Sequence, residues 1–147
     1  MKPRHIYIPL IAGAVTPSAV VFFLEMFGSR RPPSRPPSGT TLSADFIFIA
    51  LTLIPFVVLI MATATVSAKL RGWRLECVFW GGLVAVTGFT AYGYASVWWP
   101  LYFGGHMSST AVVAFIFIPF YALGALLVGL FVGYVISLCG GFRVNTL

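Results

Sequence analysis

Three carboxylates are the side chains of this sequence with the most potential for chemistry: Glu25, Asp45 and Glu76. All three lie near the ends of long apolar segments, and an ionisable residue in such a segment is a functional-site candidate by default. Glu25 lies deepest in its segment. It is a candidate proton or cation site, or an anchor for an arginine of a partner, but we favour a simpler ion pair with Arg30 or Arg31. Glu25, Arg30, Arg31 and Asp45 together form a candidate charged interfacial site.

The histidines and cysteines lack the spacings that metal or redox chemistry requires. His5 and His106 fall at opposite ends of the predicted membrane-spanning segments, so one chain cannot offer them as paired haem ligands. Cys77 and Cys139 belong to no C-x-x-C pair, and we expect both to be free thiols. The sequence also contains no H-E-x-x-H, P-loop or G-x-S-x-G motif. We therefore expect no enzymatic activity, no cofactor and no metal site.

The composition indicates a membrane protein. Hydrophobic residues make up 59% of the 147 residues and charged residues only 8%, whereas soluble domains carry about 25% charged residues. The mean hydropathy is +0.98. The net charge of +6 comes from short basic clusters between apolar runs, a pattern typical of polytopic proteins that contact anionic headgroups. We therefore expect the lipid bilayer, and not nucleic acid, as a partner.

Four apolar runs predict four transmembrane helices within a single domain that covers residues 1–147. The expected spans are about 6–27, 45–68, 77–99 and 110–138. We expect the fold class to be an all-α integral membrane protein. Its helices should form an antiparallel up-down bundle, and an even number of spans puts the N and C termini on the same side of the membrane.

The connections between these runs supply the expected helix boundaries. The basic, proline-rich loop 29–43 contains two copies of Arg-Pro-Pro-Ser and favours extended polyproline II. It is either a stiff link or a docking strand for an acidic partner or lipid headgroups. Ser43 is expected to cap the second span, and Pro100, Gly104 and Gly105 to mark the turn after the third. Pro9 is expected in the first turn of the first span, where a missing N–H costs little.

The distribution of basic residues predicts the orientation. With a cytoplasmic N-terminus, six of them lie inside (Lys2, Arg4, Lys69, Arg71, Arg74 and Arg143) and three lie outside (Arg30, Arg31 and Arg35). The positive-inside rule therefore favours cytoplasmic termini. We expect the protein to be integral to a bacterial cytoplasmic (inner) membrane.

Small residues recur at helical spacing in the last two spans. They form one stripe in the third span (Gly81, Ala85 and Gly88) and one in the fourth (Ala122, Ala125, Gly129 and Gly133), the latter containing a G-x-x-x-G. Small residues on one stripe let a second backbone approach closely, which lipid-facing positions do not require. These stripes predict either packing of the third span against the fourth or association with another chain.

Hydroxyl groups at mid-depth, among them Thr16, Thr52, Thr87 and Thr90, either bridge packed helices, which we favour, or line a solute path. We therefore expect a non-enzymatic protein that acts through helix–helix contacts, as an accessory subunit or partner-binding modulator of a membrane complex. Two alternatives stay open. One is a small homo-oligomeric channel or transporter for a small solute or ion, and the other is an inner-membrane immunity protein against a membrane-acting toxin.

Overall fold

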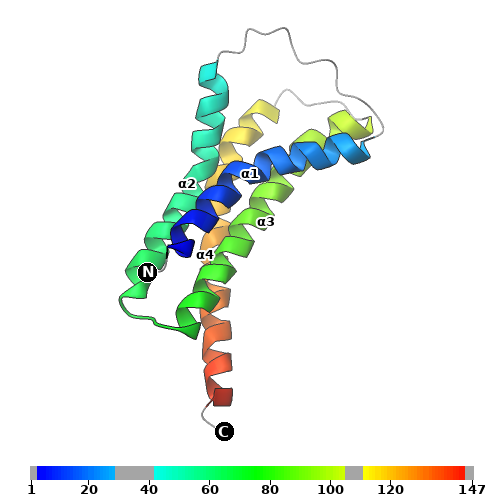
Figure 1. Cartoon of the computed structure of the whole chain (residues 1–147). Helices are drawn as coiled ribbons and strands as arrows, with labels where there is room; N and C mark the ends of the chain where they lie inside the picture. The colour runs from blue at the N-terminus through cyan, green and yellow to red at the C-terminus, as the bar shows by residue number, and fades with distance from the viewer. Residues whose placement is uncertain (1–2, 29–41, 105–110, 145–147) are drawn as a thin grey trace.

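The computed structural model describes residues 3–28, 42–104 and 111–144, and every regular element in this part of the chain is an α-helix. The four helices are α1 (Arg4–Phe27), α2 (Leu42–Ser67), α3 (Trp73–Phe103) and α4 (Ala111–Val144) (Figure 1). Each contains a stretch that is long and apolar enough to cross a membrane: Arg4–Phe27, Ala50–Ser67, Trp73–Pro100 and Ile116–Gly140. The prediction of an all-helical chain with four candidate spans is therefore confirmed.

Two helix starts differ from the predicted ones. α2 begins at Leu42, so Ser43 is a residue of the helix and not its cap. α1 begins at Arg4, so Pro9 lies in the second turn and not in the first. A proline at this position cannot donate a hydrogen bond to the carbonyl of His5. Pro9 is fully buried, so its ring contributes to packing inside the bundle.

The end of α3 also differs, because Pro100 lies within the helix and does not mark the turn. Aromatic packing stabilises the last helical turn of α3, which follows Pro100. Tyr102 is 2% exposed, and the rings of Trp99 and Phe103 stack with their centroids 4.0 Å apart. The helix ends at Gly104, which has a φ of 92° and donates its N–H to the carbonyl of Pro100. Glycine adopts this left-handed conformation without steric cost.

The core lies between α2, α3 and α4. It is filled by buried apolar side chains from these three helices: Phe56, Leu59, Phe79, Leu83, Val86 and Leu126. Both α2 and α3 contact each of the other three helices, but α3 makes the two most extensive contacts, first with α4 and then with α1.

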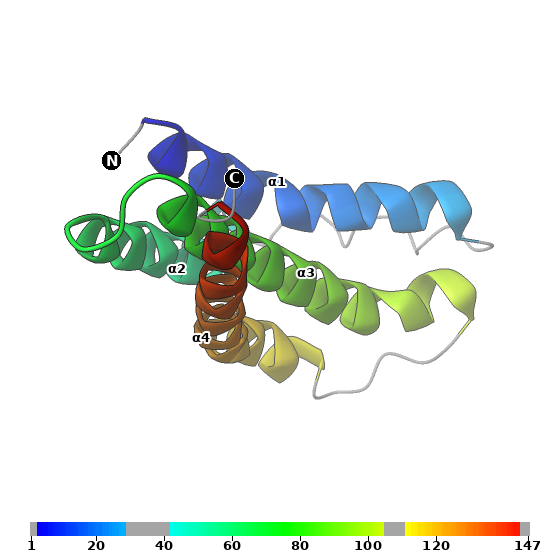
Figure 2. The ribbon, with the colours of Figure 1, turned by 90° about the horizontal axis from the view of Figure 1, so that it is seen from below.

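α1 packs against the edge of this core through Ile8 and Ala12. It contacts α2 and α3, but within the described residues it makes no contact with α4. Figure 2 shows α3 between α1 and α4. The buried stripe of α1 includes His5, Pro9, Gly13 and Thr16, which recur every three or four residues and so lie on one face. The rest of α1 exposes large apolar side chains such as Phe22.

Candidate functional site

The small residues of α3 and α4 bring the two backbones into direct contact. A Cβ atom on Gly81 would lie 2.5 Å from the carbonyl oxygen of Gly129, and a Cβ atom on Gly129 would lie 2.5 Å from the Cβ of Ala85. A Cβ atom on Gly133 would lie 2.9 Å from the Cα of Val78. Backbone atoms cannot move aside as the end of a side chain can, so these glycines accept no larger residue in this arrangement.

The remaining members of the two predicted stripes differ in their surroundings. Ala122 is fully buried, Ala125 is half-buried and Gly88 is exposed. A Cβ atom on Gly88 would meet no atom within 4 Å, so α4 does not cover this position. The α3–α4 contact continues instead at Gly93, where a Cβ atom would lie 3.0 Å from a side chain of α4. Gly93 belongs to neither predicted stripe. It lies eleven residues, or about three helical turns, after the buried Gly82 and so on the same face of α3.

Glu25 has a partner that the sequence analysis did not consider. The Tyr102 hydroxyl at the end of α3 lies beside the Glu25 carboxylate at the end of α1. Tyr102 lies beyond the apolar stretch of α3. Burial raises the pKa of its hydroxyl, and the negative charge of Glu25 raises it further. The predicted partners Arg30 and Arg31 lie outside the described residues, and Asp45 lies in the first turn of α2.

A buried histidine and an ion pair join the first turns of α1 and α3. Arg4 donates a hydrogen bond from Nη2 to the Glu76 carboxylate, and Nε2 of His5 lies 3.4 Å from the same carboxylate. Since a carboxylate only accepts, Nε2 is the donor in this contact. His5 is 1% exposed, and its ring centroid lies 4.6 Å from that of Phe79. Among the described residues, Nδ1 of His5 has no hydrogen-bond partner.

This cluster was not predicted, because the first predicted span begins at residue 6 and leaves His5 just outside it. The available signal was the spacing of His5, Pro9, Gly13 and Thr16, which puts all four on one helical face. Gly13 on that face indicates close approach of a neighbour, and a histidine in line with it is buried as well. The pairing with Glu76, which lies 71 residues further along the chain, has no sequence signal of its own.

The buried hydroxyl groups fall into two kinds. Thr52 of α2 and Tyr94 of α3 are hydrogen-bonded to each other inside the bundle. Thr90 is 1% exposed, and within the described residues its hydroxyl, like that of Thr87, has no partner. Tyr92 is 72% exposed, so it lines no interior path. The Thr52–Tyr94 contact is therefore an example of hydroxyl groups that join neighbouring helices.

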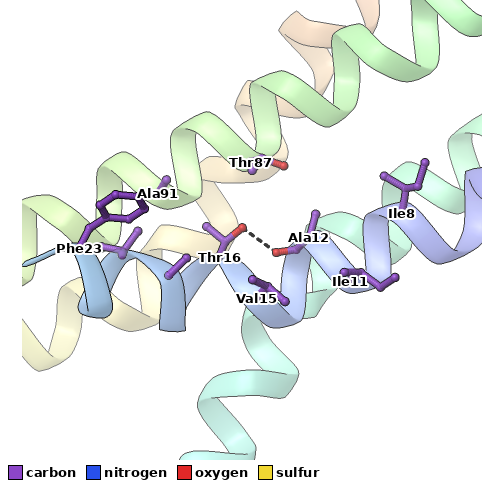
Figure 3. A pocket seen from close by; sticks show the side chains of 10 residues that line it. Ile8, Ile11, Ala12, Val15, Thr16, Phe23, Thr87 and Ala91 are labelled. Atoms are coloured by element: carbon purple, nitrogen blue, oxygen red, sulfur yellow. Dashed lines mark hydrogen bonds between the residues drawn. The ribbon is translucent and has the colours of Figure 1, made fainter. Parts of the chain in front are cut away.

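An apolar groove of about 500 Å³ lies between α1 and α3. Eight residues of α1 form one wall, and Thr87 and Ala91 of α3 form the other (Figure 3). The hydroxyls at the groove are not free to bind a ligand from it. Thr16 donates to the carbonyl of Ala12 at 2.6 Å, and the Thr87 oxygen has almost no exposed surface. The groove therefore presents hydrocarbon along its length.

The described residues contain no group of three or more His, Cys, Asp or Glu side chains placed to hold a metal ion, and both cysteines are free thiols. Comparison with known protein families, with curated proteins and with solved structures gives no match. The class of this protein is therefore defined by its own architecture, as an all-helical chain with four helices long and apolar enough to span a membrane.

Proposed function

We propose that the four helices cross the bilayer as an antiparallel up-down bundle with both termini in the bacterial cytoplasm. Contacts between helix ends support this arrangement. Trp73 packs on Gly140, which pairs the start of α3 with the end of α4, and His5 contacts Phe79, which pairs the starts of α1 and α3. The excess of basic residues at the ends so paired supports cytoplasmic termini.

Within that membrane, the protein acts without catalysis, through helix contacts with another chain, as an accessory subunit or partner-binding modulator. The observation that carries this proposal is the exposed Gly88. Gly129 and Gly133 are in contact with α3 of the same chain, whereas Gly88 continues the small-residue stripe onto a face that none of the described helical residues covers. A glycine offers lipid chains nothing to pack on, but it admits a second backbone. Large side chains flank it one turn away on either side, since Val84 is 67% and Tyr92 is 72% exposed.

The experiment is native mass spectrometry of the protein extracted from its own membranes in mild detergent, for the wild type and two leucine variants. Gly88→Leu should lose the partner chains, because the added side chain holds the second backbone away. Gly124→Leu is the matched control, since Gly124 is also exposed and open but lies on α4 outside the predicted stripes. Retention of all partners by Gly88→Leu would refute the assignment of this face.

A homo-oligomeric channel is the second candidate, since the open face at Gly88 accepts a second copy of this chain as readily as it accepts another protein. Since the core between α2, α3 and α4 is filled by side chains, a solute path would have to run between copies of the chain. The same extraction distinguishes the two functions. Unrelated chains at fixed stoichiometry support the accessory subunit. A pure homo-oligomer that conducts an ion or solute in liposomes supports the channel.

A further inference from the structure

The groove between α1 and α3 is too narrow for a transmembrane helix. Its wall on α1 runs from Ile8 to Phe23, a length of about 22 Å at ~1.5 Å per residue. A helix segment of that length and about 10 Å in diameter has a volume of roughly 1,700 Å³, so most of it would lie outside this groove. A slender hydrocarbon chain fits this shape. In the interior of a bilayer, no water is present to fill it instead.

One charged side chain lies in line with the groove. Arg4, Ile8, Ile11 and Val15 follow one another at four- and three-residue steps, so they lie on the same face of α1. Three of them line the groove, and Arg4 extends the line by one turn. Arg4 is also the first residue of the candidate span, at the depth where lipid phosphates meet the hydrocarbon.

The guanidinium of Arg4 keeps donors for a second acceptor. A guanidinium has five N–H donors in a planar fork, and Nη2 donates one of them to Glu76. The side chain of Arg4 is 47% exposed, whereas that of Glu76 is 19% exposed and that of His5 is 1% exposed. The carboxylate and the imidazole therefore support the guanidinium from inside the protein while its outer edge faces the surroundings.

The electrostatic field at this end of the molecule is positive. Lys69, Arg71 and Arg74 are exposed in and after the turn between α2 and α3, which lies at the same end as the start of α1 (Figure 1). Glu76 is the only acid between residues 50 and 104, and it is already bonded to Arg4 and His5. Such a surface attracts anionic lipid headgroups over zwitterionic ones.

We propose that the α1–α3 groove is a binding site for an anionic phospholipid, with one acyl chain in the groove and the phosphate on Arg4. The phosphate accepts charge-assisted hydrogen bonds from the outer edge of the guanidinium. The acyl chain starts one turn deeper, at Ile8, and follows the hydrocarbon walls past Ala91. This site does not depend on the proposed partner contact at Gly88, which is not among the residues that line the groove.

The test is a lipid titration of the purified protein in detergent, read by native mass spectrometry. Phosphatidylglycerol and phosphatidylcholine with identical acyl chains are the two probes. Both lipids carry a phosphate that Arg4 binds, but the choline of phosphatidylcholine brings a positive charge to the basic end of the protein, so the wild type should bind phosphatidylglycerol about tenfold more tightly. Arg4→Gln should weaken the binding of both lipids and should lower the preference more than the loss of another basic residue does, and Arg4→Lys should restore part of both. Ala91→Phe should weaken the binding of both lipids, because the ring fills the groove while the Arg4–Glu76 pair stays intact.

Arg71→Gln is the matched control, since it removes one exposed charge at the same end of the molecule but outside the line of the groove. Equal binding of the two lipids by the wild type would overturn the proposal. So would an equal loss of preference in Arg4→Gln and Arg71→Gln, which would indicate a general surface charge. Unchanged binding by Ala91→Phe would show that the chain lies elsewhere. Displacement of the lipid by inorganic phosphate would show that the site recognises free phosphate.

Discussion

The two neighbours of α3 on opposite sides pack against it in different ways. On one side, α4 approaches so closely that the glycine backbones touch, at Gly81, Gly129 and Gly133. On the other side, α1 is joined to α3 by polar groups near its ends, with Glu76 binding Arg4 at one end and Tyr102 lying beside Glu25 at the other. Between those ends lies the open groove. One helix contact is thus made by touching backbones, and the other by side chains and by polar groups at its two ends.

The difference follows from residue size. Glycine at three positions lets α3 and α4 gain dispersion contacts along the whole interface, which is the main attraction available to helices in lipid. α1 has only Gly13 on its buried stripe, where the added Cβ would meet Phe56 of α2 at 2.8 Å and not α3. α1 and α3 therefore meet without glycine-to-glycine backbone contact, through side chains such as Ile8 and Ala12 and through polar groups near the helix ends. We therefore expect substitutions to act on the whole fold at α3–α4 but locally at α1.

The largest effect is expected from Gly129→Leu. The leucine would collide with the Gly81 carbonyl and with Ala85, and neither can move without separating the helices. Overpacking against a backbone should cost about 3 kcal/mol or more. Unfolding in mixed micelles, followed by circular dichroism, measures this cost. Gly124→Leu is the control, because the added side chain meets open space. Equal stability of the two variants would contradict a continuous α3–α4 contact.

A smaller and more local effect is expected from Glu76→Leu. The substitution leaves the His5 ring buried with no acceptor for Nε2, which costs about 2 kcal/mol for an unsatisfied buried group. The half-exposed Arg4 adds little to this value. Hydrogen exchange should increase in residues 4–12 and remain as in the wild type around Gly81. Glu76→Gln retains an oxygen for His5 and should show about half of the effect. An increase of exchange throughout α3 and α4 would contradict a local role of these polar groups at α1.

The buried pair Thr52–Tyr94 should contribute less than Glu76 does. It joins α2 to α3 inside the core, and hydrogen bonds between membrane helices are worth about 0.6 kcal/mol on average. Thr52→Val and Tyr94→Phe each remove one partner while keeping most of the shape. A double-mutant cycle on the free energy of unfolding should give a coupling of about 0.5–1 kcal/mol. A coupling near zero would show that the two hydroxyls act independently.

The same comparison explains which features could be predicted from the sequence. Four long apolar runs predict four helices, because hydrophobic length is a property of a continuous segment. The ends of the helices were harder to predict. Pro100 was expected to stop α3 but lies within the helix, because the buried Tyr102 stabilises the helical turn that follows it. This packing depends on side chains that meet only in the folded chain, as the Tyr102 hydroxyl meets Glu25 across two helices.

The candidate site residues divide in the same way, into those that one segment reveals and those that only the folded chain brings together. Gly81 and Gly129 were singled out by helical spacing, which a single segment displays. The spacing did not show where α3 and α4 diverge. Gly88 belongs to the predicted stripe but lies beyond that point, where α4 does not cover it. The pairing of His5 with Glu76 joins segments 71 residues apart. No periodicity within either segment records such a pairing.

The smallest effect, with the opposite sign, is expected from alanine at the open glycines. Gly88→Ala and Gly124→Ala each place a methyl group in open space. Within a helix, alanine is favoured over glycine by about 0.5–1 kcal/mol, because an alanine residue has less backbone freedom in the unfolded chain and so loses less entropy on folding. Unfolding of the isolated protein should therefore show both variants slightly more stable than the wild type, whereas Gly129→Ala should be less stable despite the same gain in propensity. The sign of the change, measured for one substitution at three positions, then separates glycines that bring backbones together from glycines that do not. If Gly88→Ala stabilises the isolated chain and yet weakens its association with partners, Gly88 serves a contact between chains, as Gly129 serves the contact within one.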